Sequence, residues 1–139
     1  MEQRLLVTGA SGRVGSLIRH HLRRPGRELR LLDLTPPPGL DADAETFLAG
    51  SVTDPEAMAA ACKEVDLVVH LGGHASERTW NDIVDTNIHG TYVVLEAARR
   101  HEVRRVLLAS DAGPPGPPDP DIRLGGSWGG PGWEVGRPW

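Results

Sequence analysis

The sequence predicts an α/β fold, a doubly wound parallel sheet that stops after about five strands and continues into an irregular tail. Short apolar runs alternate with longer segments of helical periodicity, the pattern of repeated strand–helix–strand units. From Asp111 the composition changes abruptly, with eight glycines and seven prolines in the last 29 residues. We therefore expect two parts, a folded domain at 1–110 and a Gly/Pro/Trp-rich tail at 111–139.

Five short apolar runs are predicted to be strands, because each is bounded by turn residues or by a helical segment. They cover residues 4–7, 29–34, 47–49, 65–71 and 103–109.

Three segments of helical periodicity lie between these strands. The first follows the first strand and stops at Pro25-Gly26, the second covers 56–63 after Thr53 or Asp54 as the cap, and the third covers 80–100. The inward positions we expect are Val14, Leu17, Ile18, His21 and Leu22 in the first helix and Ile83, Val84, Asn87, Ile88, Val94, Leu95 and Ala98 in the third.

The tail at 111–139 predicts neither a helix nor a central strand, because proline removes hydrogen-bond donors and glycine costs backbone entropy. We expect it to be irregular or disordered. A proline-rich ligand segment for another domain is the alternative. The tail contains no clean PxxP repeat with flanking basic residues, which argues against that alternative.

Composition argues against several classes of function. The formal net charge of −4 gives no general attraction to nucleic acid or to anionic membranes. No apolar run approaches the roughly 20 residues that span a bilayer, and no signal peptide precedes the first strand. The single cysteine, Cys62, cannot form an internal disulfide. We expect a cytoplasmic protein with a small-molecule substrate, and self-association remains open.

The charged and ionisable side chains carry two further expectations. Six histidines form no HExxH set, and we expect no metal site. His70 is expected at a strand end, and Cys62 as a small buried hydrophobe. Five arginines are expected on a solvated face of the first helix and its exit: Arg19, Arg23, Arg24, Arg27 and Arg30.

A glycine-rich loop follows the first strand and opens the first helix, as in the Rossmann dinucleotide-binding motif. Three glycines let the chain turn, bring backbone N–H groups to a pyrophosphate and pack the helix closely on the sheet. A glycine-rich turn without a ligand is the alternative. The predicted contacts come from Gly9, Ser11, Gly12, Arg13, Val14 and Gly15.

Asp33 lies 18 residues beyond Gly15, at the end of the second predicted strand. A carboxylate there can accept both hydroxyls of an adenosine ribose and would repel a 2′-phosphate, so the sequence predicts NAD over NADP. Leu34 follows, and no arginine directly after the acid would receive that phosphate. A strand-end aspartate that caps a turn is the alternative.

The spacing TGxxGxxG resembles that of the short-chain dehydrogenases, particularly their extended branch, the epimerase/dehydratase family. The resemblance implies that Ser51 and Val52 contact the adenine. It implies that Leu71, Gly72 and Gly73 line the ribose on the nicotinamide side. Asn87 matches the helix asparagine that supports the active site in that family.

Residues 70–83, with Asn87 and Gly90, resemble the uronate dehydrogenases, which oxidise galacturonate or glucuronate to an aldarolactone with NAD. This resemblance implies that Ala75 and Ser76 lie where the family contacts the sugar acid. Sugar-nucleotide epimerases and dehydratases of the same branch are the runner-up family.

The chain departs from the family at its catalytic motif. The family uses a tyrosine as base, a lysine four residues later and a serine that orients the substrate. Tyr92 is the only tyrosine here and Lys63 is the only lysine. Tyr92 lies within the long helix, where we expect it to be a packing residue and not a base. Ser110 matches the start of the serine pair, and Asp111 replaces its second member.

Two expectations follow from this departure. The reading frame is expected to leave the family near residue 110, where ordered-protein composition also stops. We also expect this chain to be inactive as an enzyme. A non-catalytic NAD-binding fragment is therefore weighed beside the dehydrogenase interpretation.

Overall fold

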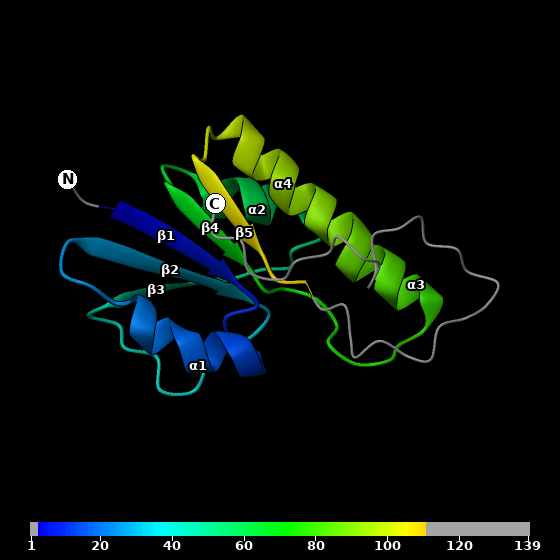
Figure 1. Ribbon diagram of the computed structural model, residues 1–139, viewed down its shortest axis with the longest axis horizontal. Coiled ribbons are helices and arrows are strands. Elements are labelled where there is room, and N and C mark those ends of the chain that lie inside the picture. Colours follow the sequence, from blue (N-terminus) through cyan, green and yellow to red (C-terminus); the bar gives the residue numbers. More distant parts are fainter. Residues whose placement is uncertain (1–2, 111–139) are drawn as a thin grey trace, which may run out of the picture. The chain divides into compact units, whose positions relative to one another are not determined.

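The computed structural model describes residues 3–110, which form a five-stranded parallel sheet (Figure 1). The strands lie in the order β3-β2-β1-β4-β5. Successive connections therefore run outward in both directions from the central strand β1, which confirms the doubly wound class. The strand bounds are β1 Gln3–Thr8, β2 Arg27–Asp33, β3 Glu45–Ala49, β4 Leu67–His70 and β5 Arg105–Leu108.

Helices cover both faces of the sheet, with α1 on one face and α2 and α4 on the other (Figure 1). Between β2 and β3 the chain crosses without a helix. The helix bounds are α1 Arg13–Leu22, α2 Pro55–Cys62, α3 Trp80–Asp82, the π-helix η1 Ile83–His89 and α4 Gly90–Arg100.

Alternating side chains of the central strand divide the core into two layers. Leu5 and Val7 pack in the layer beside α1, whereas Leu6 packs in the layer beneath α2 and α4. Both layers are fully buried at β1, as expected for a parallel sheet with covered faces.

The predicted strands all exist, but their bounds differ. β2 and β3 begin two residues earlier than predicted, whereas β4 and β5 are shorter at both ends. The apolar runs at 65–71 and 103–109 include Val65, Leu71 and Val103, which pack in the core but lie outside the ladder. Hydrophobicity marks burial, and strand ends depend on pairing with neighbours.

The second helix follows its sequence signals closely. Asp54 is the cap, and its side chain accepts a hydrogen bond of 2.9 Å from the Glu56 backbone N–H, with Pro55 at the first position. Cys62 is buried at the other end, as expected, and burial raises the pKa of its thiol to about 11. The thiol is therefore neutral near pH 7.

The third predicted helix is continuous but not uniform. Its first half is the π-helix η1, where the Gly90 N–H bonds to the Asp85 carbonyl five residues back. Each i to i+5 turn contains one residue more than an α-turn and shifts the inward face. The expected burial of Ile88 and Leu95 is therefore wrong, and Val93 and Ala97 are buried instead.

Tyr92 also lies on the outer side of this helix. Its side chain is 63% exposed, so the expected packing role is wrong.

The inward face of α1 is rotated from the expected one. Gly15, Ile18, Arg19 and Leu22 face the sheet, whereas Leu17 is 66% exposed. Val14 and His21 are exposed as well. The apolar positions therefore did not define this face, because a buried charged residue occupies its centre.

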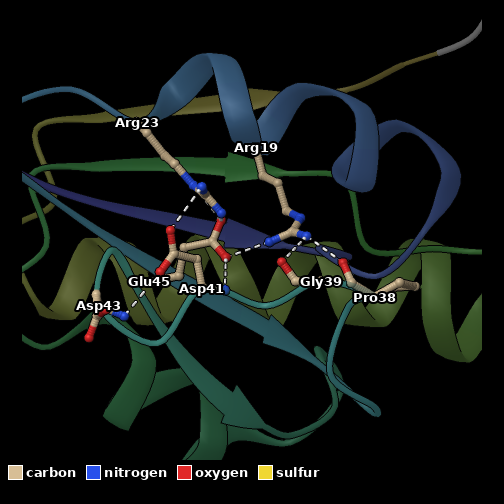
Figure 2. Close-up of polar contacts among 7 residues, drawn as sticks. All are labelled: Arg19, Arg23, Pro38, Gly39, Asp41, Asp43 and Glu45. Carbon is tan, nitrogen blue, oxygen red and sulfur yellow. Dashed lines mark hydrogen bonds and ion pairs between the residues drawn. The ribbon is translucent and has the colours of Figure 1, made fainter.

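The expectation of a solvated arginine face is wrong for Arg19, whose side chain is 1% exposed. Figure 2 shows Arg19 extending from α1 to the Glu45 carboxylate and to the carbonyl oxygens of Pro38 and Gly39. Arg23 binds the other oxygen of Glu45 at 3.1 Å. Two cations therefore neutralise one fully buried carboxylate.

Two of the other three arginines, Arg27 and Arg30, also differ from the expectation. Arg27 donates to the Leu22 carbonyl, and Arg30 donates to the carbonyls of Ala61 and Lys63. Arg24 is exposed, as expected. The guanidinium groups of Arg27 and Arg30 thus bind backbone carbonyls as well as side chains.

Replacing Arg19 by methionine tests the energetic role of this contact. Breaking a buried ion pair from one side costs about 3–5 kcal/mol, because the other charge stays buried. Since Arg23 still reaches Glu45, we expect Arg19→Met to lower the free energy of unfolding by about 3 kcal/mol. Urea denaturation measures this change.

The matched control is Arg99→Met, which breaks the exposed pair between Arg99 and Glu96. Exposed pairs contribute little to stability, so this variant should unfold close to the wild-type midpoint. Equal losses in the two variants would contradict the role assigned to Arg19.

Candidate functional site

A groove of about 520 Å³ opens at the carboxyl ends of β1, β2 and β4. In doubly wound sheets this edge is the usual ligand site, because the chain leaves the central strands in opposite directions there. The residues lining the groove are Gly9, Ser11, Gly12, Leu32, Asp33, Leu34, Thr35, Gly50, Ser51, Val52, Leu71, Gly72, Gly73, His74 and Thr86.

The loop from β1 to α1 forms the floor of the groove. Gly9 has a left-handed backbone with φ of 67°, and its N–H donates to the Leu32 carbonyl at 3.0 Å. A Cβ at Gly9 would lie 2.7 Å from the Gly72 nitrogen. Glycine is required here because the two loops meet backbone to backbone.

The start of α1 is suited to an anion. Gly12 is the N-cap and offers no side-chain hydrogen bond, and the first turn contains no acidic residue. Gly15 packs against the Gly9 carbonyl, so a side chain there would collide with the loop. Backbone N–H groups of the first turn and the helix dipole together favour a phosphate at this point.

Asp33 ends β2 at one end of the groove. Its Oδ2 accepts from the Ser11 N–H at 2.9 Å, and its Oδ1 accepts from the Leu34 N–H at 2.7 Å. Ser11 Oγ also donates to the Thr35 carbonyl. A carboxylate has about four acceptor positions, so each oxygen keeps one for a ligand hydroxyl.

Small residues bring the opposite wall of the groove close to its floor. A Cβ at Gly72 would lie 2.7 Å from Val52 Cγ1, and one at Gly90 would lie 2.9 Å from Val52 Cγ2. Val52 is buried between these two glycines. Ser51 Oγ lies 2.8 Å from Thr53 Oγ1, which fixes the loop after β3.

The end of β4 carries a buried polar cluster. His70 Nδ1 lies 2.6 Å from Thr8 Oγ1, and Nε2 lies 3.2 Å from Thr91 Oγ1. Asn87 Oδ1 accepts from the His74 N–H at 2.7 Å, and Asn87 Nδ2 donates to the His74 carbonyl at 3.0 Å. These contacts hold the segment after β4 against β1 and the π-helix.

The structure brings ten of the predicted site residues to the groove: Gly9, Ser11, Gly12, Asp33, Leu34, Ser51, Val52, Leu71, Gly72 and Gly73. Others lie outside its lining. Gly15 and Asn87 support it from behind, Arg13 and Val14 begin α1 with exposed side chains, and Ala75, Ser76 and Ser110 are exposed.

Sequence reasoning missed five lining residues. Leu32 and Gly50 precede predicted residues directly, so the motif boundaries could have included them. Thr35 is placed by its carbonyl bond to Ser11, and His74 and Thr86 by the Asn87 contacts and the π-helix. No local pattern indicates such contacts between distant segments.

A second hollow of about 510 Å³ lies at the opposite edge, beside the amino ends of β2 and β3. Three arginines and three carboxylates line it, so their formal charges cancel: Arg23, Arg24, Arg27, Glu28, Asp43 and Glu45. Arg23 binds Glu45 within this set, whereas Glu28 pairs with Arg30 outside it. The lining presents no glycine loop or helix N-terminus.

Comparison with known proteins identifies the family. Residues 5–124 match the NAD dependent epimerase/dehydratase family. The chain belongs to this family. NAD, the cofactor predicted from the glycine loop and Asp33, is the cofactor of the family.

Among curated relatives, the uronate dehydrogenase of Pseudomonas putida KT2440 is 36% identical over 107 residues, 77% of this chain and 40% of that protein. The uronate dehydrogenase of Pseudomonas syringae pv. tomato is 38% identical over 77% of this chain and 39% of its own length. These identities confirm the resemblance to uronate dehydrogenases that residues 70–83 predict.

Among solved structures, glucuronic acid dehydrogenase from Chromohalobacter salexigens is 43% identical with a TM-score of 0.73, over 81% of this chain and 42% of that one. A uronate dehydrogenase variant from Agrobacterium tumefaciens in complex with NAD is 37% identical with a TM-score of 0.72, over 79% and 41%. The present chain spans about 40% of the length of these relatives.

Residues 3–110 contain neither a membrane-spanning helix nor a cluster of metal-binding side chains. No helix there is long and apolar enough to cross a membrane. No group of three or more metal-binding side chains gathers in the same residues.

Burial lowers the pKa of His70 below its usual value of about 6.5. As pH falls through 6.5, the unfolded chain gains a proton that folded His70 does not, so the folded state loses stability. We expect the free energy of unfolding in urea to fall between pH 7.5 and 5.5.

The variant His70→Gln carries no titrating ring, whereas the other five histidines remain. Its free energy of unfolding should change less over the same interval, whatever its absolute stability. Parallel pH profiles for the two proteins would show that other groups cause the loss.

Proposed function

We propose that this chain is the cofactor-binding part of an NAD-dependent oxidoreductase that oxidises a hexuronate. The observation that carries the proposal is the groove itself. It combines an uncapped helix N-terminus with a strand-end carboxylate that keeps two acceptor positions. These are the two groups that a pyrophosphate and an adenosine ribose require.

The residues present fit NAD along the length of the groove. The pyrophosphate would lie at the first turn of α1, and Asp33 would accept the hydroxyls of the adenosine ribose. Ser51 and Val52 would border the adenine. The nicotinamide half would then extend along Leu71–His74 at the other end of the groove. When bound, NAD supplies the hydride acceptor.

Electrostatics support NAD over NADP. A 2′-phosphate would come against the Asp33 carboxylate, and like charges at this distance repel. The groove-lining residues of the described part include no lysine or arginine that would offset this repulsion.

Galacturonate or glucuronate is the substrate class we propose, with an aldarolactone as product. Support comes from the likeness of residues 70–83 and from the similarity to uronate dehydrogenases. Ala75 and Ser76 lie exposed on the segment that leaves the groove, where a sugar acid could reach them. A sugar-nucleotide epimerase or dehydratase is the second candidate, since the family includes both.

We further propose that the 139-residue chain binds NAD without turnover. The sequence contains no tyrosine followed four residues later by lysine. Tyr92 lines a separate hollow between α2 and α4, together with Pro55 and His101. Asp33 and His74 are the ionisable side chains that line the groove in the described part. General bases contribute about 10²–10⁴-fold to rate, and the family's base is missing.

The cofactor preference can be tested by replacing Asp33. Wild-type protein should bind NAD more tightly than NADP in calorimetric titrations, and Asp33→Ala should remove most of this difference. The matched control is Asp43→Ala, an exposed aspartate in the β2–β3 connection. Equal wild-type affinities for the two cofactors would refute the role of Asp33.

Turnover can be tested directly with NAD and either galacturonate or glucuronate. We expect no NADH above background, measured by its ultraviolet absorbance, in a preparation of verified mass that binds NAD. Formation of NADH that disappears in His74→Gln would contradict the proposal and would make His74 the base.

A further inference from the structure

A continuous chain of hydrogen bonds runs beneath the cofactor groove, from the segment after β4 to the π-helix. The Gly72 N–H lies 3.3 Å from Thr8 Oγ1, which lies 2.6 Å from His70 Nδ1. On the other side of the ring, Nε2 lies 3.2 Å from Thr91 Oγ1, which lies 2.6 Å from the Asn87 carbonyl oxygen. Four links therefore join two segments that border the groove.

The two ends of this chain determine which atom donates at every link. The Asn87 carbonyl can only accept, so Thr91 donates its single hydroxyl hydrogen to it and must accept from His70 Nε2. The Gly72 N–H can only donate, so Thr8 accepts from it and has its own hydrogen free for His70 Nδ1.

Only a neutral ring with its hydrogen on Nε2 satisfies all four links and also gives the Thr8 hydroxyl hydrogen an acceptor. A hydrogen on Nδ1 would leave the Thr8 hydroxyl hydrogen without an acceptor, and Thr8 is fully buried. His70 itself is 4% exposed, so a charged ring would be costly as well.

The connected segments hold the cofactor groove from behind. Leu71, Gly72, Gly73 and His74 line it, and the Asn87 side chain binds both the N–H and the carbonyl of His74. One end of the segment is therefore fixed through Thr8 and the other through Asn87. The His70 ring is the part that connects these two attachments.

We infer that His70 is a positioning residue that sets the spacing between the segment after β4 and the π-helix. It thereby controls affinity for the nicotinamide half of the dinucleotide, a role that rests on the proposed cofactor function. It touches the segment that holds the cofactor and takes no part in proton transfer. Asp33 and the first turn of α1 lie outside this hydrogen-bond chain, so the adenosine half does not depend on it.

Thr91→Val tests this inference, because valine keeps the shape of threonine and removes both hydroxyl links. We expect this variant to bind NAD about threefold to tenfold more weakly, the loss typical of one or two net hydrogen bonds. AMP carries only the adenosine half, so its affinity should change by less than about twofold. Thr91→Ser retains the hydroxyl and should restore NAD binding.

The control is Thr46→Val, an exposed threonine on β3 outside the groove, which should bind both ligands as the wild type does. Heteronuclear NMR of the wild-type histidine rings gives an independent readout. His70, assigned by its absence in His70→Gln, should show a hydrogen on Nε2 and none on Nδ1 at neutral pH.

A ring protonated at Nδ1, or an equal loss of NAD and AMP affinity in Thr91→Val, would overturn the inference. Wild-type protein that binds neither NAD nor AMP would overturn the proposed function and the cofactor role of His70 with it. The NMR result decides which atom donates at each link of the chain, even if Thr91→Val does not fold.

Discussion

This site depends on one constraint, which is that β1, β2 and β4 end in register at the same edge of the sheet. Thr8, the last residue of β1, pairs with Leu32 of β2 on one side and with His70 of β4 on the other. The chain then leaves β1 and β2 on one face and β4 on the other, so the strand ends stay uncovered. Gly9 and Gly72 allow the two loops to meet without side chains between them. The groove, the helix N-terminus and Asp33 all take their positions from this register.

The buried Arg19–Glu45 contact plays a corresponding part at the edge of the sheet. The connection from β2 to β3 contains no helix, and Pro37 is its buried apolar residue. Arg19 offers donors to the Pro38 and Gly39 carbonyls and a charge to Glu45. A hydrophobic residue could fill the same space but could not satisfy these backbone oxygens. Donor geometry, more than charge, explains why arginine lies inside.

The sequence predicts those parts of the molecule that depend on local pattern. Apolar runs indicate the five strands, and Asp54-Pro55 indicates the start of α2. The spaced glycines and Asp33 predict one end of the groove. Contacts between distant segments could not be predicted. Arg19 looks like one of several surface arginines until Glu45, 26 residues away, is placed beside it. The π-helix changes which side chains face inward, and its residues, Ile83–His89, include no glycine or proline that would have predicted it.

The same π-helix connects the fold to the chemistry. With i to i+5 bonding, the helix is wider at Asn87, and its side chain reaches both backbone groups of His74. Thr91, four residues later, turns its hydroxyl between the Asn87 carbonyl and His70. A regular α-helix would change the direction of Asn87 relative to Thr91, because each of its turns contains one residue fewer. The irregular helix therefore allows two attachments behind the groove, one through Asn87 to His74 and one through Thr91 to His70.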